Sequence, residues 1–240
     1  MGTGGFPHYS YPLSWQREKF NGIVAVYFPC TFSATAIFYR AKSIVKKLHC
    51  CNTHLEGGDQ MTDLMNIIKG RRSIRKYEDK DVPDELLNQI LESVQWAPSW
   101  ANSQCWEMIV VKDQGVKEAL AEALPKTNPA RKHFTEAPVI LVLCGKLGSA
   151  GYYKDQVTTK FGDWFMFDLG LAAQNLCLTA HDLGLGTVIT GLFDHGKAGE
   201  VLGIPEGYEL VSLIPLGYPA HDSKAPKRRE ISEFTHYDKF

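Results

Sequence analysis

The chain has 240 residues, 44% of them hydrophobic, and a formal net charge of −1. This length and composition allow one sizeable core and favour one domain over two. The near-neutral charge argues against a protein that coats nucleic acid or an anionic membrane, because those partners require a large basic excess. Six cysteines without the spacing of a small disulfide framework indicate a reducing, cytoplasmic compartment.

Residues 1–60 differ in character from the rest and show little periodicity that would bury one face. We expect an N-terminal extension that is poorly ordered or not native. Positions 22–39 are uncharged, which leaves a membrane anchor open, although Pro29 and several Ser, Thr and Cys residues weaken that interpretation. The cluster HCCNTH, at 49–54, lacks a second ligand pair at zinc-finger spacing and is a poor metal site.

The segment LEGGDQ, at 55–60, is what a purine-rich ribosome-binding sequence would encode if it were translated. Met61 follows at once and opens a well-patterned helix. We therefore expect Met61 to be the native start, with 61–240 as the functional domain. Intact mass of the protein made from its own locus tests this, and a mass matching all 240 residues contradicts it.

From Met61 onward, the apolar pattern predicts a mixture of helices and strands. Thr62 or Asp63 caps a first helix that Gly70 ends, and Pro83 starts a second helix. Helical periodicity predicts the further helices 116–124, 161–183 and 195–203. Apolar, β-branched and aromatic runs predict the strands 106–111, 138–144, 187–191 and 209–219.

The order and character of these elements predict the fold class. The strand 138–144 is almost wholly apolar, which is typical of a central strand buried on both faces. The helix 161–183 is apolar nearly all round, so we expect it at the centre of the molecule or in a subunit interface. Strands and helices do not alternate strictly, which favours an α+β fold with a mainly antiparallel sheet.

Several standard catalytic motifs are absent from the sequence. There is no GxGxxG after a strand, no GxxxxGK[ST], no HExxH and no GxSxG. Cys105, Cys144 and Cys177 each sit singly in an apolar run, which indicates buried free thiols. No protein nucleophile is therefore expected.

Two basic turns lie near opposite ends of the domain, RRSIR at 71–75 and PKRR at 226–229. Guanidinium forks match phosphate oxygens bidentately, and Ser73 adds a neutral donor. Two such clusters suggest one shared anion. For either cluster alone, a solvated charged surface remains the alternative interpretation.

A third turn, PSWANSQ at 98–104, carries amide side chains. Asn102 and Gln104 each offer donors and acceptors, which suits the edge of a heterocycle with carbonyl groups and ring nitrogens. Capping and turn formation after Pro98 explain the same residues equally well.

Together these segments resemble the FMN-dependent nitroreductases. RRSIRKY, APSWANSQCW, DLGLAAQNLCLTAHDLGLGT, VITGLFD, LIPLGYP and a basic KRR occur in the family's order and approximate spacing. The resemblance runs from Met61 to Glu233 and leaves 1–60 uncovered. It implies a nitroreductase-like α+β fold, with a central, mainly antiparallel sheet surrounded by helices. It also implies an intertwined homodimer that builds two FMN sites at its interface.

Position by position, the resemblance implies cofactor contacts in three groups. Thr190 and Gly191 resemble a strand-end turn whose backbone N–H groups face the flavin N5 and O4. Phosphate and ribityl contacts would come from Arg71, Arg72, Ser73, Arg75, Lys227 and Arg229. Flavin contacts from the second chain would come from Pro98, Ser99, Trp100, Asn102 and Gln104.

Two positions depart from the family pattern. Cys105 stands where the family often has Pro, which should alter only local rigidity. Thr190 stands where the family often has Glu, which affects what the reactive face of the flavin meets. Acceptor preference is therefore open.

The resemblance implies an NAD(P)H oxidoreductase in which the flavin carries the chemistry, with no catalytic protein residue and no metal. Hydride would pass from NADH or NADPH to flavin N5, and then to a nitroaromatic, quinone or similar electron-poor small molecule. Three alternatives stay open: a flavin-fragmenting or dehalogenating relative, a non-catalytic flavin-binding module, and a nucleic-acid patch. The last is disfavoured, because 61–240 holds 20 Lys and Arg against 24 Asp and Glu. Neither the acceptor nor the nucleotide preference can be read from the residues.

Overall fold

The computed structural model describes residues 18–20, 23–25 and 63–240. The chain divides into two units, Met1–Gly58 and Asp59–Phe240. In the first unit, β1 (Glu18–Phe20) pairs antiparallel with β2 (Ile23–Ala25). The HCCNTH cluster, the start at Met61 and most of the uncharged stretch 22–39 lie outside the described residues. Among the helices that are described, none has the length and apolar character to cross a membrane.

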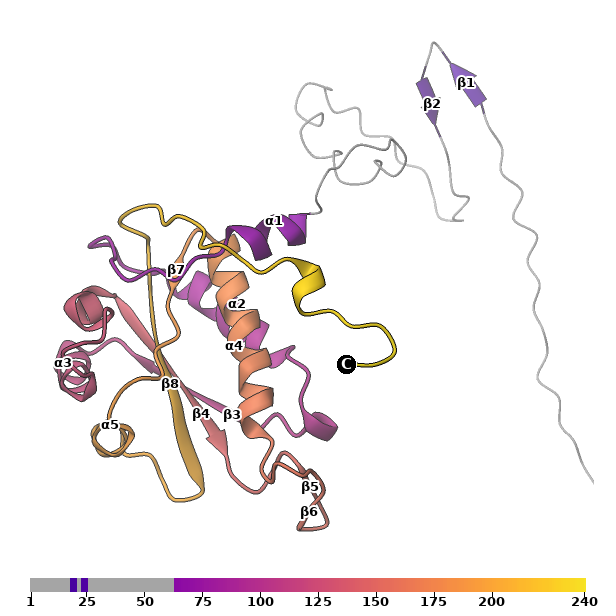
Figure 1. The fold of residues 1–240 in the computed structure, drawn as a ribbon. Coiled ribbons are helices and arrows are strands. Elements are labelled where there is room, and N and C mark those ends of the chain that lie inside the picture. Colours follow the sequence, from indigo (N-terminus) through magenta and orange to yellow (C-terminus); the bar gives the residue numbers. More distant parts are fainter. Residues whose placement is uncertain (1–17, 21–22, 26–62) are drawn as a thin grey trace, which may run out of the picture. The chain divides into compact units, whose positions relative to one another are not determined.

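The second unit holds the candidate site, and its elements follow the predicted order (Figure 1). The helices are α1 (Asp63–Gly70), α2 (Asp84–Gln95), α3 (Gln114–Ala123), α4 (Phe165–Asp182) and α5 (His195–Leu202). The strands are β3 (Trp106–Val111), β4 (Val139–Lys146), β5 (Tyr152–Tyr153), β6 (Gln156–Val157), β7 (Gly186–Thr187) and β8 (Tyr208–Gly217). Short 3-10 helices are η1 (Trp100–Asn102), η2 (Arg131–Glu136) and η3 (Ile231–Glu233).

The central sheet has the strand order β3-β4-β8-β7, and its neighbouring strands are antiparallel. Helices cover both faces, with α2 and α4 on one side and α3 and α5 on the other (Figure 1). Strand β4 explains the layering, because alternate side chains point to opposite faces. Its Ile140 and Val142 pack with Leu120 of α3, whereas Leu141 packs with Ile90 of α2. The α+β class and the buried central strand are therefore confirmed.

Helix α4 is the longest helix of the described residues, as predicted, but it begins only at Phe165. The residues before it form a turn in which Gly162 has a φ of 75° and the Trp164 N–H donates to the Ala150 carbonyl at 2.9 Å. Seven of its 18 residues are buried, whereas Met166 and Phe167 in its first turn are exposed. The first turn therefore leaves an apolar face uncovered in this chain.

The predicted strand 187–191 is much shorter than expected. Only Gly186 and Thr187 pair with β8 as a strand, and Thr190 makes one isolated bridge to Leu213. The same register places Val188 opposite Pro215, which has no N–H to donate across the ladder. The β5–β6 hairpin was not predicted, because its strands are only two residues long.

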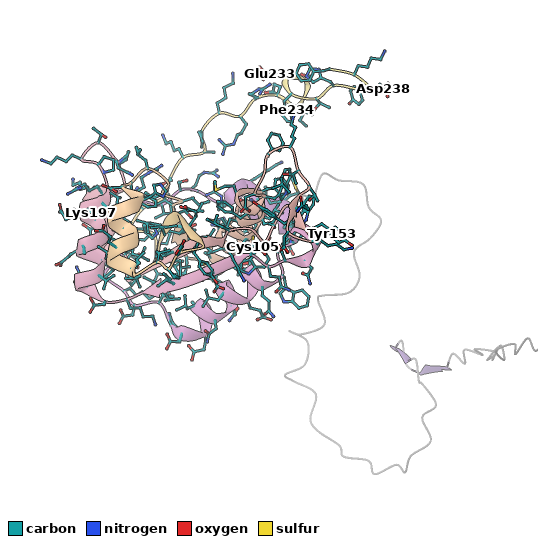
Figure 2. All side chains as sticks on the ribbon, turned by 90° about the horizontal axis from the view of Figure 1, so that it is seen from below. Cys105, Tyr153, Lys197, Glu233, Phe234 and Asp238 are labelled. Atoms are coloured by element: carbon teal, nitrogen blue, oxygen red, sulfur yellow. The ribbon has the colours of Figure 1, made fainter. Side chains whose placement is uncertain are left out.

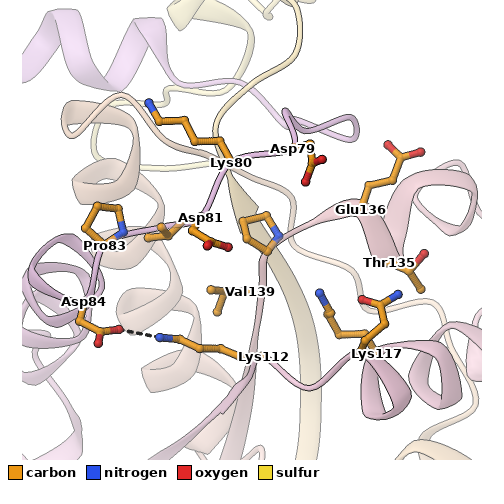
Figure 3. Close-up of a pocket in the computed structure, with 13 residues that line it drawn as sticks. Asp79, Lys80, Asp81, Pro83, Asp84, Lys112, Lys117, Thr135, Glu136 and Val139 are labelled. Atoms are coloured by element: carbon orange, nitrogen blue, oxygen red, sulfur yellow. Dashed lines mark hydrogen bonds and ion pairs between the residues drawn. The ribbon is translucent and has the colours of Figure 1, made fainter.

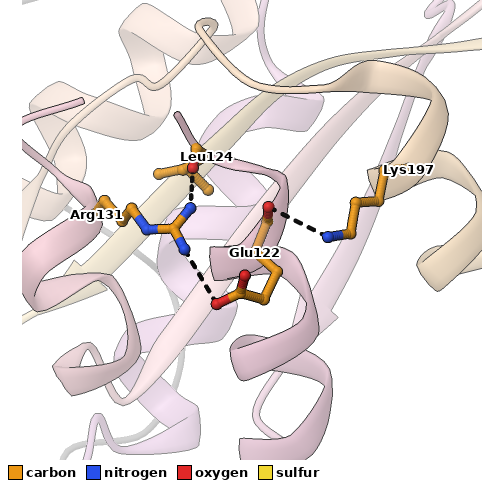
Figure 4. Close-up of polar contacts among 4 residues, drawn as sticks. All are labelled: Glu122, Leu124, Arg131 and Lys197. Carbon is orange, nitrogen blue, oxygen red and sulfur yellow. Dashed lines mark hydrogen bonds and ion pairs between the residues drawn. The ribbon is translucent and has the colours of Figure 1, made fainter. Parts of the chain in front are cut away.

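The connector 125–137 is fixed to two helices (Figure 4). Arg131 of η2 pairs with the Glu122 carboxylate at 3.0 Å and donates to the Leu124 carbonyl. Lys197 of α5 donates to the Glu122 carbonyl at 3.3 Å. These bonds tie η2, α3 and α5 together on one face of the sheet.

Gly186 allows β7 to lie against Ile74, because a Cβ at this glycine would come within 2.5 Å of Ile74 Cγ1 and 2.7 Å of Ile74 Cβ. We expect Gly186→Ala to lower the free energy of unfolding by about 1–3 kcal/mol through overpacking. Denaturant unfolding measures the effect. The matched variant Gly199→Ala, in α5, meets no atom closer than 4.0 Å and should gain about 0.5–1 kcal/mol from helix propensity. Equal stabilities of the two variants would contradict the assigned packing.

Candidate functional site

The two basic turns meet at one cavity of about 490 Å³, which we call the cationic cavity. Five of its lining residues are Lys or Arg and only one is a carboxylate. The lining is Arg71, Arg72, Ser73, Arg75, His221, Asp222, Ser223, Lys224, Pro226 and Arg228. An excess of four positive charges around one small space, balanced by no buried acid, suits an anionic ligand.

The cations of this cavity also lack acidic partners within residues 63–240. The ion pairs there join Lys112 to Asp84, Arg131 to Glu122 and His133 to Glu136, and none of them reaches the cavity. Asp222 lines the cavity but lies beyond 4.0 Å from the Lys and Arg nitrogens of residues 63–240. The charge excess is thus available to a ligand.

The first basic turn is held by the end of α1 and by the sheet. The Arg71 N–H donates to the Ile67 carbonyl at 2.9 Å, which continues the last turn of α1. Buried Ile74 donates its N–H to the Thr187 carbonyl at 2.9 Å, and Ser73 bridges Thr187 in parallel. Burial of Ile74 between Ser73 and Arg75 turns the polar neighbours toward the cavity side.

The three arginines of this turn are not equivalent. Arg72 Nη1 donates to the Lys69 carbonyl at 2.6 Å and the Arg71 carbonyl at 2.8 Å, so part of this guanidinium caps the end of α1. Arg75 makes one long bond, 3.4 Å, to the Ser73 carbonyl. The Arg71 guanidinium has no bond of this kind to any described residue. Arg71 is therefore the arginine most available to a ligand.

In the second basic turn, the structure places Arg228 in the cavity lining, rather than Lys227 or Arg229. Arg229 donates to the Glu233 carbonyl and lies 5.6 Å from the centre of the Phe234 ring. Figure 2 shows Glu233 and Phe234 in a C-terminal segment that leads away from the layered body. No periodicity in PKRR could indicate which of its cations faces inward, and Lys224 and His221 were missed for the same reason.

The turn at Thr190 and Gly191 differs from its expected role. The Thr190 N–H donates to the Leu213 carbonyl at 3.0 Å, so this backbone amide is not free for a ligand. The Gly191 N–H bonds no backbone carbonyl of the described residues, and the Gly191 carbonyl lies 3.3 Å from His195 Nε2. Thr190 Oγ1 is buried and has no hydrogen-bond partner. The turn thus offers one free amide and one unpartnered hydroxyl.

The segment 98–104 forms a tight turn in strained backbone. Ala101, Asn102 and Gln104 have φ values of 43°, 56° and 47°, in the left-handed region that costs a non-glycine residue roughly 1–2 kcal/mol. Ser99 Oγ accepts from the Gln104 N–H at 3.0 Å, and Gln104 Nε2 donates to Asn102 Oδ1 at 3.3 Å. The side chains of Asn102 and Gln104 stay exposed.

This amide-bearing turn and the cationic cavity lie toward opposite ends of α4. The Trp100 N–H donates to Asp168, in the first turn of the helix, at 2.9 Å. Arg71 and Arg72 line a smaller cavity, of about 210 Å³, together with His181 in the last turn. Asp168 and His181 are thirteen positions apart in the helix, which corresponds to roughly 20 Å along the axis. One chain therefore does not bring the two predicted halves of the site together.

Cys105, Cys144 and Cys177 are buried free thiols, as predicted. Burial raises the pKa of Cys105 to about 11, helped by the Asp168 carboxylate 3.7 Å from its sulfur. Burial likewise raises the pKa of Cys144 to about 11, and it raises the pKa of Cys177. These thiols stay protonated at neutral pH, so none is poised as a nucleophile.

Burial lowers the pKa of His181 below its usual 6.5, and the charges of Arg71 and Arg72 lower it further. The unfolded chain therefore binds a proton at pH values where the folded chain does not, and stability falls as pH drops below about 6.5. We expect His181→Gln to reduce this loss between pH 7.5 and 5.5, measured by denaturant unfolding at both pH values. An unchanged slope in His181→Gln would contradict the assignment.

A larger cavity, of about 580 Å³, lies elsewhere and has a different character (Figure 3). Four acids and three lysines line it, so its charges nearly cancel. Lys112 pairs with Asp84 at 2.6 Å, and buried Lys117 donates to the Ala137 carbonyl at 3.1 Å. Two of its three lysines already have partners and its acids outnumber its lysines, so the cationic cavity is the stronger candidate for an anionic ligand.

Comparison with known proteins agrees with the fold and with the order of these segments. The model of the Nitroreductase family matches residues 68–218. The FMN reductase (NAD(P)H) of Bacillus subtilis is 32% identical over 180 residues, which make up 70% of this chain and 70% of that protein. The iodotyrosine deiodinase of Hydra vulgaris is 24% identical over 197 residues, or 69% of each chain. A solved FMN-dependent nitroreductase of Clostridium difficile R20291 has a TM-score of 0.62 at 27% identity, covering 73% of this chain and 99% of that one. The chain therefore belongs to the nitroreductase family.

Proposed function

We propose that the protein is an FMN-dependent NAD(P)H oxidoreductase that reduces flat, electron-poor small molecules such as nitroaromatics or quinones. The observation that carries the proposal is the cationic cavity, which unites two basic turns far apart in the sequence and has no acidic partner within residues 63–240. When bound, FMN supplies the redox chemistry by taking a hydride from NAD(P)H and passing electrons to the acceptor. Every other task falls to residues that bind and orient.

The residues present fit a phosphate in the cationic cavity. Arg71 and Arg228 provide unpaired guanidinium donors, and Ser73 provides a hydroxyl between two arginines. Charge-assisted bonds from such donors are about twice as strong as neutral ones. The phosphate of FMN would therefore anchor here, with Arg75 and Lys224 completing the charge balance. Lys227 and Arg229 belong to the same basic turn but lie outside the cavity lining, so we rank them below Arg228 as phosphate contacts.

The segment 187–191 runs from the phosphate site toward the proposed place of the flavin ring. Ser73 bridges Thr187, and three residues further Thr190 bridges Leu213. The Gly191 N–H, which bonds no backbone carbonyl of the described residues, is a donor that suits the carbonyl and ring-nitrogen edge of an isoalloxazine. Fixed donors of this kind favour the electron-rich reduced ring, because they need no reorganisation when charge develops.

We propose that two chains share each site, as a homodimer. The turn 98–104 sits roughly 20 Å along α4 from the phosphate end, so its exposed Asn102 and Gln104 suit the flavin of a second chain. The described residues leave large apolar side chains exposed on α1 and α4, which a second copy would cover. These include Leu64, Ile68, Met166 and Phe167.

A dehalogenating activity is the second candidate, supported by the similarity to an iodotyrosine deiodinase. Such an activity would use the same phosphate site and a lid with polar contacts to a zwitterionic substrate. The connector 125–137 is bonded through Arg131 to Glu122 and Leu124 at the end of α3, and Lys197 of α5 binds the same Glu122, which gives that segment little freedom to act as a lid. The nitroreductase-like activity is therefore the preferred proposal.

Anaerobic stopped-flow absorbance tests the function. The purified protein loaded with FMN should be bleached by NADH or NADPH and re-oxidised by nitrofurazone or menadione. Bleaching without re-oxidation by any acceptor in a panel that includes 3-iodotyrosine would contradict the proposed activity. A flavin that neither nucleotide bleaches would leave a flavin-binding module instead.

A further inference from the structure

The strained turn 98–104 is fixed by one buried acid that the sequence analysis did not single out. Asp168 is 1% exposed, and it is the one acidic residue among the buried residues of α4. Its Oδ2 accepts from the Trp100 N–H at 2.9 Å and lies 3.7 Å from Cys105 Sγ. The carboxylate thus contacts Trp100 within the turn and Cys105 directly after it.

The geometry points to Asp168 as the positioning residue that holds the turn 98–104, with left-handed backbone at Ala101, Asn102 and Gln104, and thereby aims Asn102 and Gln104 at the flavin. A buried carboxylate is costly unless donors satisfy it, and here the donors come from the turn itself. Left-handed backbone at Ala101, Asn102 and Gln104 persists only where surrounding structure enforces it. The helix N-terminus at Phe165 adds favourable potential for the negative charge.

Cys105 is the second half of this arrangement. Its backbone is fixed in the sheet, since its carbonyl accepts from the Lys146 N–H at 2.8 Å. Its thiol can donate to Asp168, a bond that proline at this position could not make. The departure from the family pattern at Cys105 therefore supplies a donor rather than only altering rigidity (Figure 2 places Cys105 inside the layered body).

The inference rests on the proposed function, because the position of the turn affects binding only if the Asn102 and Gln104 side chains contact a flavin. FMN affinity, measured by fluorescence quenching, should fall at least about tenfold in Asp168→Ala. Loss of a residue that orients a direct ligand contact typically has an effect of this size. Asn102→Ala should lower affinity as well. If Asp168 acts through Asn102, the double variant should lose little more than the worse single variant, because the two effects are coupled.

Lys117→Met is the matched control. It also removes a buried ionisable side chain with one bond to a backbone carbonyl, but that residue lies on α3, on the other face of the sheet. We expect it to shift the unfolding midpoint and leave FMN affinity within about twofold of wild type. Cys105→Ser, which keeps a donor, should bind FMN better than Cys105→Ala.

The outcomes separate this inference from the proposed function. A wild-type protein that binds no FMN would defeat the proposed function itself. Wild-type binding together with unchanged affinity in Asp168→Ala would overturn the positioning role alone. Additive losses in the Asp168→Ala/Asn102→Ala double variant would also overturn it, because Asp168 would then act on stability rather than on the turn.

Discussion

Arg71→Ala should weaken FMN binding by about 10- to 100-fold while leaving the fold intact. The guanidinium of Arg71 lines the cationic cavity and has no bond to a described residue, so a bound phosphate would be its main partner. Loss of one charge-assisted bond corresponds to about 1.5–3 kcal/mol. Because no side-chain hydrogen bond or ion pair to a described residue is lost, the unfolding free energy should change by less than about 0.5 kcal/mol.

Arg228→Ala and Arg229→Ala provide a neighbouring pair of controls for this prediction. Arg228 lines the cavity, whereas Arg229 bonds the Glu233 carbonyl within its own segment. Isothermal titration with FMN should show a large loss for the first variant and a loss below about threefold for the second. Equal losses in Arg228→Ala and Arg229→Ala would mean that the C-terminal segment lies differently in the bound protein. Wild-type FMN affinity in Arg71→Ala would contradict the phosphate site.

Mixed dimers of Arg71→Ala and Asn102→Ala chains should regain an intact flavin site. In the proposed arrangement, each site combines the cationic cavity of one chain with the turn 98–104 of the other. A mixed dimer then gathers both substitutions in one site and leaves the other free of them. Differently tagged chains allow the mixed species to be isolated and its flavin counted by absorbance.

The expected result is about one tightly bound FMN per mixed dimer, against about two for wild type and close to none for either parent at low micromolar flavin. The wild-type dimer that carries both tags is the control for the purification. If each chain instead built a complete site alone, every site in the mixed dimer would be damaged. Absence of tight binding in the mixed species would thus contradict the shared site.

The sequence predicted the sheet well where local patterns decide the structure. The apolar run of β4 and the β-branched content of β3 follow from burial on the two faces, and their bounds were nearly correct. The predicted strand 187–191 was too long, because its pairing is interrupted opposite Pro215, which lies far away in the chain. Which residues pair across the sheet is a property of the tertiary structure, and no local pattern reveals it.

The same division holds for the candidate site. Two clusters rich in arginine predicted one anion, and the structure brings both to one cavity. Periodicity could not show that Arg228 faces inward, because its segment has no regular structure. The engagement of the Thr190 amide by Leu213 required the fold. Asp168 did carry a signal in the sequence, since it is the one acid between positions 165 and 181. Only the structure shows that it is buried and contacts the turn 98–104.

The most direct test of the central claim compares FMN with riboflavin, which lacks only the phosphate. Fluorescence quenching titrations with the full chain should give an affinity for FMN at least about 100-fold higher than for riboflavin, because several charge-assisted bonds depend on the phosphate. The preference should shrink in Arg71→Ala and in rising salt. Equal affinities for the two flavins, or no binding of either, would contradict a cationic cavity that holds the phosphate of FMN.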